Sequence, residues 1–309
     1  MFSRRHLFLA LGAMALVPAT LMQGAPARAA DPVIVGSKID TEGAVLGNIV
    51  ALMLEKGDIP VTRRIQLGPT KIVRTALLAG EIDVYPEYTG NAGFFFNIPD
   101  DPVWKNAQAA YEKAKELDAA NNLVWLTPAP ADNTWGIAVR GDVAREGKLA
   151  TLEDFARWVN DKGDVKLAAS AEFVESAAAL PAFQSAYGFK LSGDQLLVLS
   201  GGDTTATIKA AAEGTSGVNT AMVYGTDGAI SALGLQVMED TKHVQPVYQP
   251  APIVRADTLK DYPRIPELLA PAFEGLTLET LQKLNAQVQL EGMDAQTVAR
   301  EYLSSKGLL

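Results

Sequence analysis

The fold is decided by two neighbouring stretches of sequence, PVIVGSKIDTEGAVLGNIVALMLEKG at residues 32–57 and RIQLGPTKIVRTALLAGEIDVYP at residues 64–86. Each begins with a short apolar run that predicts a strand, and each continues with apolar residues at helical spacing. A third strand is expected at Ile82–Tyr85, ending at Pro86. This order predicts a parallel sheet with right-handed crossovers, whose ligand binds beyond the carboxyl ends of its strands. Those ends lie at the loops near Gly36, Gly68 and Pro86.

Strand and helix signals keep alternating along the rest of the chain. The further strands are expected near Thr134–Val139, Val165–Ala168, Leu196–Leu199 and Thr220–Val223, and in the segment Gly234–Arg255. The further helices are expected near Val103–Leu117, Leu152–Val159, Ser176–Tyr187, Thr205–Ala212, Tyr262–Pro271, Leu278–Leu290 and Ala295–Leu303. The pattern predicts an α/β fold of two lobes, with crossing segments near Thr134–Val139 and Thr241–Ile253.

The composition argues against an enzyme. The 309 residues are 48% apolar and include no cysteine and two histidines, which excludes disulfides, thiolate nucleophiles, iron–sulfur clusters and Cys-based zinc sites. His6 lies in a segment that we expect to be removed, so that only His243 remains. A multi-His metal site or a Ser–His dyad is therefore nearly excluded. We expect no catalytic residue, no metal and no cofactor.

The first residues predict a cleaved export signal over residues 1–29. Arg4 and Arg5 precede the apolar run Leu7–Met22, and the small-x-small pattern Ala27-Arg28-Ala29 follows it, so that cleavage is expected near Ala29/Ala30. The run is too short and too interrupted for a span of about 20 residues. Since the arginine pair also resembles a twin-arginine motif, the general secretory and twin-arginine routes both remain open. The expected location is the periplasm.

The charge balance excludes a further class of partner. Removal of residues 1–29 takes away three arginines and no acid, so the net charge moves from −9 to −12. So acidic a chain is a poor partner for nucleic acid or anionic lipid, because both favour basic patches.

Seven short strings carry a resemblance to a known family. They are Val35-Gly36-Ser37-Lys38, Thr41-Glu42, Leu46-Gly47-Asn48, Gly68-Pro69-Thr70, Glu81-Ile82-Asp83-Val84-Tyr85-Pro86-Glu87-Tyr88-Thr89-Gly90, Asp132-Asn133-Thr134-Trp135 and Val223-Tyr224-Gly225-Thr226-Asp227-Gly228. Together they resemble the substrate-binding proteins of glycine betaine/choline (osmoprotectant) ABC importers, and most of all the OsmF/YehZ-like branch. The resemblance covers essentially the whole mature chain.

The resemblance implies a type II periplasmic binding protein of the Venus flytrap kind, with a mixed, mostly parallel sheet in each lobe. Its two lobes close over one small quaternary ammonium ligand and deliver it to an ABC permease in the inner membrane. We expect a monomer. Residues 30–136 are expected to form the first part of lobe 1, residues 137–242 lobe 2, and residues 243–309 the rest of lobe 1.

The resemblance also implies a cage for the trimethylammonium group, which is held by aromatic faces because it donates no strong hydrogen bond. By position the cage residues are Tyr88, Trp135 and Tyr224, and Asp132 is expected to add a counter-charge. The polar ligand contacts are expected from side chains at strand ends and helix starts, where amides and hydroxyls meet an anionic group. These are Ser37, Lys38, Thr70, Thr204 and Thr205. For Ser37, Lys38 and Thr70, helix capping or a solvated charge is an equal alternative.

Two positions depart from the family pattern. The family commonly has an aromatic residue where Thr205 stands and Gln where Gly43 stands. The loss of one aromatic wall costs about 0.5–2 kcal/mol. With hydroxyls from Thr204 and Thr205 instead, a more polar or anionic ligand group becomes an alternative. Glu42 is interpreted as a first-turn acid that favours the helix dipole.

Two further functions remain as alternatives. The same fold serves a sensor as well as an importer. The second alternative is a periplasmic carboxylate-based hydrolase. This alternative has less support, because no spacing in the sequence specifies a pair of carboxylates roughly 5–10 Å apart.

Overall fold

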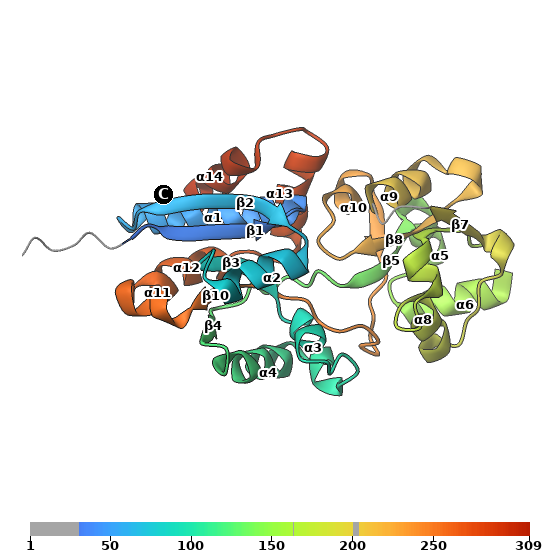
Figure 1. Cartoon of the computed structure of the whole chain (residues 1–309). Coiled ribbons are helices and arrows are strands. Elements are labelled where there is room, and N and C mark those ends of the chain that lie inside the picture. The colour runs from blue at the N-terminus through green and yellow to red at the C-terminus, as the bar shows by residue number, and fades with distance from the viewer. Residues whose placement is uncertain (1–30, 163, 200–203) are drawn as a thin grey trace, which may run out of the picture. The chain divides into compact units, whose positions relative to one another are not determined.

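The computed structural model describes residues 31–162, 164–199 and 204–309 (Figure 1), so the predicted export signal lies outside the described residues. Residues 32–309 belong to one compact unit. Among the described residues, no helix has the length and apolar character needed to cross a membrane.

The first sheet has the strand order β2-β1-β3-β10-β4. Strand β1 pairs in parallel with β2 and with β3, whereas β10 is antiparallel to both of its neighbours. The predicted parallel unit is therefore present, with α1 and α2 as its connections. The bounds are β1 Val33–Lys38, α1 Thr41–Lys56, β2 Val61–Gly68, α2 Thr70–Ala79, β3 Val84–Tyr88, β4 Leu123–Trp125 and β10 Pro250–Arg255.

The third strand runs through the proline that was expected to end it. Strand β3 begins at Val84, since the Asp83 side chain accepts the Ile34 N–H at 2.8 Å. Pro86 lies inside β3, opposite Pro252 of β10, and Val84 is the one β3 residue that pairs with β1. The missing N–H of Pro86 therefore removes no ladder hydrogen bond, which is the condition under which a strand tolerates proline.

The second sheet has the order β7-β6-β8-β5-β9. Its strands β6, β7 and β8 pair in parallel, and β5 is antiparallel to both neighbours. In each sheet the antiparallel strand is the first one after the chain crosses over, so both sheets are mixed and mostly parallel. The bounds are β5 Trp135–Arg140, β6 Leu167–Ser170, β7 Leu196–Leu199, β8 Thr220–Tyr224 and β9 Leu235–Val237.

The helices follow the predicted order with two breaks. The helix expected near Ser176–Tyr187 begins later, as α8 at Leu180, because Ser176 is extended and Pro181 lies in the first turn of α8; the short helix α7, which ends at Glu175, was not expected. The helix expected around Val103–Leu117 is a 3-10 turn followed by α4, whose first turn is capped by Asn106. The remaining bounds are α3 Asn91–Phe95, α4 Ala107–Ala119, α5 Gly141–Gly147, α6 Leu152–Lys162, α7 Ala171–Glu175, α8 Leu180–Tyr187, α9 Thr204–Glu213, α10 Gly228–Ala232, α11 Ala256–Asp261, α12 Ile265–Glu274, α13 Leu278–Gln289 and α14 Ala295–Ser305.

The two crossing segments run side by side and are hydrogen-bonded to each other. The Asn133 N–H donates to the Tyr248 carbonyl at 3.0 Å, and the Tyr248 N–H donates to the Asp132 carboxylate at 2.7 Å. The Thr134 hydroxyl donates to the Pro246 carbonyl at 2.8 Å. These bonds join the two connections between the sheets into one ribbon. The lobe boundaries at 136/137 and 242/243 remain predictions.

Candidate ligand-binding site

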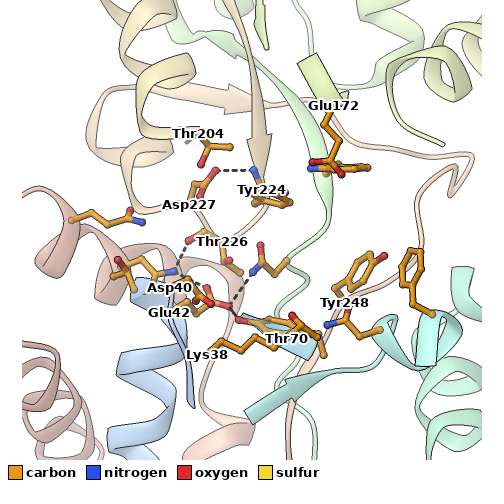
Figure 2. A pocket seen from close by; sticks show the side chains of 18 residues that line it. Lys38, Asp40, Glu42, Thr70, Glu172, Thr204, Tyr224, Thr226, Asp227 and Tyr248 are labelled. Atoms are coloured by element: carbon orange, nitrogen blue, oxygen red, sulfur yellow. Dashed lines mark hydrogen bonds between the residues drawn. The ribbon is translucent and has the colours of Figure 1, made fainter. Parts of the chain in front are cut away.

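A cavity of about 540 Å³ opens at the carboxyl ends of the parallel strands β1, β3 and β8 and at the amino end of the antiparallel strand β5. Figure 2 shows Lys38, Asp40, Glu42 and Thr70 from one side and Glu172, Thr204, Tyr224 and Asp227 from the other, all facing the same space. The lining residues are Lys38, Asp40, Thr41, Glu42, Thr70, Tyr88, Asn91, Phe94, Asn133, Trp135, Glu172, Thr204, Tyr224, Thr226, Asp227, Tyr248, Asn285 and Gln289.

Six of the nine residues predicted as ligand contacts line this cavity. They are Lys38, Thr70, Tyr88, Trp135, Thr204 and Tyr224. The structure brings them together from two sheets and two helix starts. Whether they contact a ligand remains a prediction.

Trp135 and Tyr224 form a stacked aromatic pair. They lie opposite each other on the antiparallel strands β5 and β8, and their ring centroids are 6.1 Å apart with an interplanar angle of 25°. The edge of Phe173 packs against Trp135 at 5.9 Å and 84°. Burial raises the pKa of Tyr224, so its phenol stays neutral. The pair is thus a rigid, uncharged aromatic wall, held by cross-strand pairing.

The third predicted cage residue, Tyr88, already has a cation on its ring. The Lys38 Nζ lies 4.4 Å from the ring centroid and 2.5 Å from the Glu87 Oε1. Glu87 is fully buried and also accepts hydrogen bonds from the Tyr85 hydroxyl, the Tyr88 N–H and the Asn91 amide, each at 2.7 Å. Lys38 is therefore committed to Glu87 and covers one face of Tyr88.

Glu42 is a second buried carboxylate in the cavity wall. It is 5% exposed and accepts hydrogen bonds from the Tyr88 hydroxyl at 2.6 Å, the Asn285 amide at 2.7 Å and the Asn133 amide at 3.3 Å. Burial raises its pKa to about 7, and hydrogen bonds from Thr226, Tyr88 and Asn285 partly offset this shift. The interpretation of Glu42 as a first-turn acid is correct for its place in α1, but it missed that this side chain lines the cavity.

Three predicted contacts are not among the lining residues. Ser37 is fully buried, and its hydroxyl accepts the Gln66 N–H at 2.8 Å. Asp132 holds the Tyr248 N–H, and burial raises its pKa to about 6. Thr205 follows Thr204 in the first turn of α9 but does not line the cavity. Ser37 and Asp132 thus hold backbone segments together.

Sequence reasoning missed several lining residues. Tyr248 comes from the return crossing segment, where an aromatic side chain beside the expected hinge was the available signal. Burial raises its pKa to about 12. Asn285 comes from α13, and its amide donates to both Glu42 and the Thr226 carbonyl. No local signal points to Asn285, because its role depends on a partner 243 residues away.

The charges around the cavity are mostly negative. Asp40, Glu42, Glu172 and Asp227 line it, and among the described lining residues Lys38 is the one base. Because Lys38 is paired with Glu87, the cavity favours a positively charged ligand group. Within the described residues, no group of three His, Asp or Glu side chains is placed to hold a metal ion.

Comparison with known proteins gives concordant matches. Residues 31–305 match the family described as the substrate binding domain of the ABC-type glycine betaine transport system, OpuAC. The glycine betaine-binding protein YehZ of Escherichia coli (strain K12) is 58% identical over 283 residues, which cover 91% of this chain and 93% of that protein. The glycine-betaine-binding protein of Pseudomonas aeruginosa is 30% identical over 286 residues, which cover 91% of this chain and 89% of that protein. The solved structure of apo YehZ from E. coli has a TM-score of 0.85, with 91% of this chain and 100% of that chain covered.

Proposed function

This chain belongs to the family of substrate-binding domains of ABC-type glycine betaine transport systems, and we propose that its cavity captures a small quaternary ammonium compound, with glycine betaine as the first candidate. The two-lobed α/β fold and the assignment to transport rather than catalysis are confirmed by the family and its solved member. The observation that carries the proposed ligand class is the stacked pair Trp135–Tyr224, in a cavity where Lys38, the one base among the described lining residues, is paired with Glu87.

The ammonium end of such a ligand fits the aromatic wall. A trimethylammonium group is apolar on its surface and positively charged, so it gains from cation–π contact and from packing against rings. Trp135 and Tyr224 offer adjacent ring systems, and Tyr248 adds a third neutral ring from the crossing ribbon. The acids that line the cavity add long-range attraction to the same charge.

The carboxylate end of a betaine needs donors instead. Thr70 begins the ten-residue helix α2. The N-cap residue of this helix, Pro69, makes no side-chain capping hydrogen bond, and the first turn contains no acidic residue. Thr204 begins α9 on the other sheet and is also a lining residue. Free N–H groups and hydroxyls at helix starts are the sites that a carboxylate takes up.

Binding is proposed to couple to closure of the lobes about the crossing ribbon. The support is the ribbon itself, where Asp132, Asn133 and Thr134 are hydrogen-bonded to Pro246 and Tyr248. A ligand that contacts both sheets favours the closed state by its extra contacts there. We further propose that the protein acts as a monomer in the periplasm, after removal of residues 1–29, and delivers its ligand to a membrane permease.

Titration calorimetry tests this function on the mature protein freed of endogenous ligand. Glycine betaine, choline, carnitine and proline betaine are each titrated into the protein and into Trp135→Leu and Trp135→Tyr. Leucine keeps apolar volume but removes the π face, so the affinity is expected to fall by roughly 2–30-fold, as a cation–π contact of about 0.5–2 kcal/mol implies. Tyrosine keeps a π face, so Trp135→Tyr is the matched control and is expected to retain most of the affinity. A folded protein that gives no heat with any of the four compounds refutes the proposed ligand class.

A further inference from the structure

Glu42 differs from the other buried carboxylate of this wall in the partners that it has. Glu87 is paired with the Lys38 ammonium at 2.5 Å. Glu42 receives its hydrogen bonds from neutral groups, namely the hydroxyls of Tyr88 and Thr226 and the amides of Asn133 and Asn285. No cation lies within ion-pair distance of Glu42 among the described residues. Its charge is therefore solvated by dipoles but not neutralised.

The neighbouring amides add to this negative potential. Asn133 and Asn285 turn their NH₂ groups toward Glu42, and their Oδ1 atoms are buried without a hydrogen-bond donor in the described part of the chain. Both residues line the cavity. These buried oxygens do not face the cavity directly, but their partial negative charges add to the attraction that Glu42 exerts on a cation there.

The titratable groups around Glu42 come from both sheets and from the crossing ribbon. Asp40 precedes it at the start of α1 and disfavours its ionisation. Lys38 on β1 is held by Glu87 of β3, and Tyr88 of β3 and Tyr248 of the crossing ribbon have raised pKa values and stay neutral. The second sheet contributes Glu172 of α7, Tyr224 of β8 and Asp227 before α10.

We propose that Glu42 is a specificity-determining residue of this site, whose ionised carboxylate strengthens the binding of ligands of net positive charge, such as choline, more than the binding of zwitterions such as glycine betaine. The inference rests on the proposed function, because it concerns the selection of ligand in the same cavity. A net cation gains the full attraction of the buried carboxylate. A zwitterion brings its own carboxylate into an acidic cavity, which offsets the attraction of its ammonium group.

If Glu42 acts as the counter-ion of the ligand, binding of a cation is coupled to loss of the proton from Glu42. Since burial raises the pKa of Glu42 to about 7, the carboxyl is partly protonated at neutral pH, and a bound cation drives the proton off. If the ionised form alone attracts the cation, the association constant of choline rises by roughly 30-fold between pH 5.5 and pH 8.5 and levels off above pH 7. The carboxyl of glycine betaine stays ionised in this range, so its association constant changes less.

The experiment is titration calorimetry of choline and of glycine betaine, from pH 5.5 to 8.5, in buffers of different ionisation enthalpy. The wild-type protein is expected to release up to about half a proton when choline binds at pH 7. Glu42→Gln is expected to release none and to bind the two ligands in a ratio that does not change with pH. Asp132→Asn is the comparison variant, because it removes the other buried acid with a raised pKa at a residue that does not itself line the cavity, and the release of a proton at pH 7 is expected to persist in it.

A second variant keeps the test decisive should Glu42→Gln fold poorly. Tyr88→Phe leaves the carboxyl in place but removes the 2.6 Å hydrogen bond that lowers its pKa, so the midpoint of the choline profile is expected to move to higher pH. A ratio of choline to glycine betaine affinity that is the same in Glu42→Gln and in the wild type at every pH overturns the role of Glu42 alone. Absence of binding by either ligand at every pH overturns the proposed function as well.

Discussion

Replacing Lys38 with methionine removes the one ion-pair partner that Glu87 has in the described part of the chain. The side chains of Lys38 and Glu87 are 7% and 0% exposed, so the carboxylate left behind has no access to water. Removing one partner of a buried pair costs about 3–5 kcal/mol, because it leaves a buried charge uncompensated. Three neutral donors remain on Glu87, from Tyr85, Tyr88 and Asn91. We therefore expect the lower end, about 3 kcal/mol.

Thermal and urea unfolding at pH 7.5 measure this cost. A loss of about 3 kcal/mol corresponds to a fall in Tm of about 5 °C for a chain of this size, because the entropy of unfolding grows with the number of residues. The double variant Lys38→Met/Glu87→Gln is expected to regain most of the loss, because it removes the stranded charge and retains a side chain that accepts hydrogen bonds. Methionine also takes the ammonium off the Tyr88 ring, so the double variant is expected to bind quaternary ammonium ligands at least as tightly as the wild type. A Lys38→Met protein as stable as the wild type would refute the reasoning.

Three further predictions concern stability. The pKa of Glu42 is raised from 4.5 to about 7 in the folded protein, so the folded state binds this proton more tightly than the unfolded state does. The free energy of unfolding is therefore expected to fall by about 3 kcal/mol as the pH rises from 4.5 to 7, and Glu42→Gln is expected to flatten this dependence. Asp132→Asn is expected to do the same at lower pH, since the pKa of Asp132 is raised from 3.8 to about 6. Gly228→Ala places a Cβ 2.1 Å from the Ala286 nitrogen, so α10 and α13 must separate, and a clearly lowered Tm is expected; an unchanged Tm would contradict this packing.

The fold was predictable from sequence where the period of the hydrophobic residues agrees with the Gly and Pro residues that end helices and strands. The first sheet follows from apolar runs that alternate with helical spacing, and Gly80 ends α2 in the left-handed conformation, with φ 74°, that favours glycine. The pattern failed at Pro86, because tolerance of proline depends on which neighbour pairs with that stretch of strand. It also missed the short helices α3, α5, α10 and α11, each of five to seven residues. Their few positions give no reliable period.

The candidate site was predictable in its residue types but not in its pairings. Tyr88, Trp135 and Tyr224 were predicted by position from the resemblance to the family, and the structure places all three in the cavity wall. Tyr248 was missed because a crossing segment has no period to analyse. Asn285 was missed because α13 reaches the cavity only through tertiary packing.

Pairing decides what the cavity selects. From sequence, Lys38 is a lone base at a strand end, and this favours a contact with the ligand's carboxylate. In the structure, the Lys38 ammonium donates a hydrogen bond to Glu87, 49 residues away, and its charge is neutralised within the cavity wall between β1 and β3. The charged groups that remain unneutralised by Lys38 around the cavity are Asp40, Glu42, Glu172 and Asp227. Lys38 therefore implies an anion site when it is considered alone, whereas the cavity is a cation site once the pairing of Lys38 with Glu87 is taken into account. This reversal is why an acidic cavity wall, and not the lysine beside it, accounts for the preference that we expect for a quaternary ammonium group.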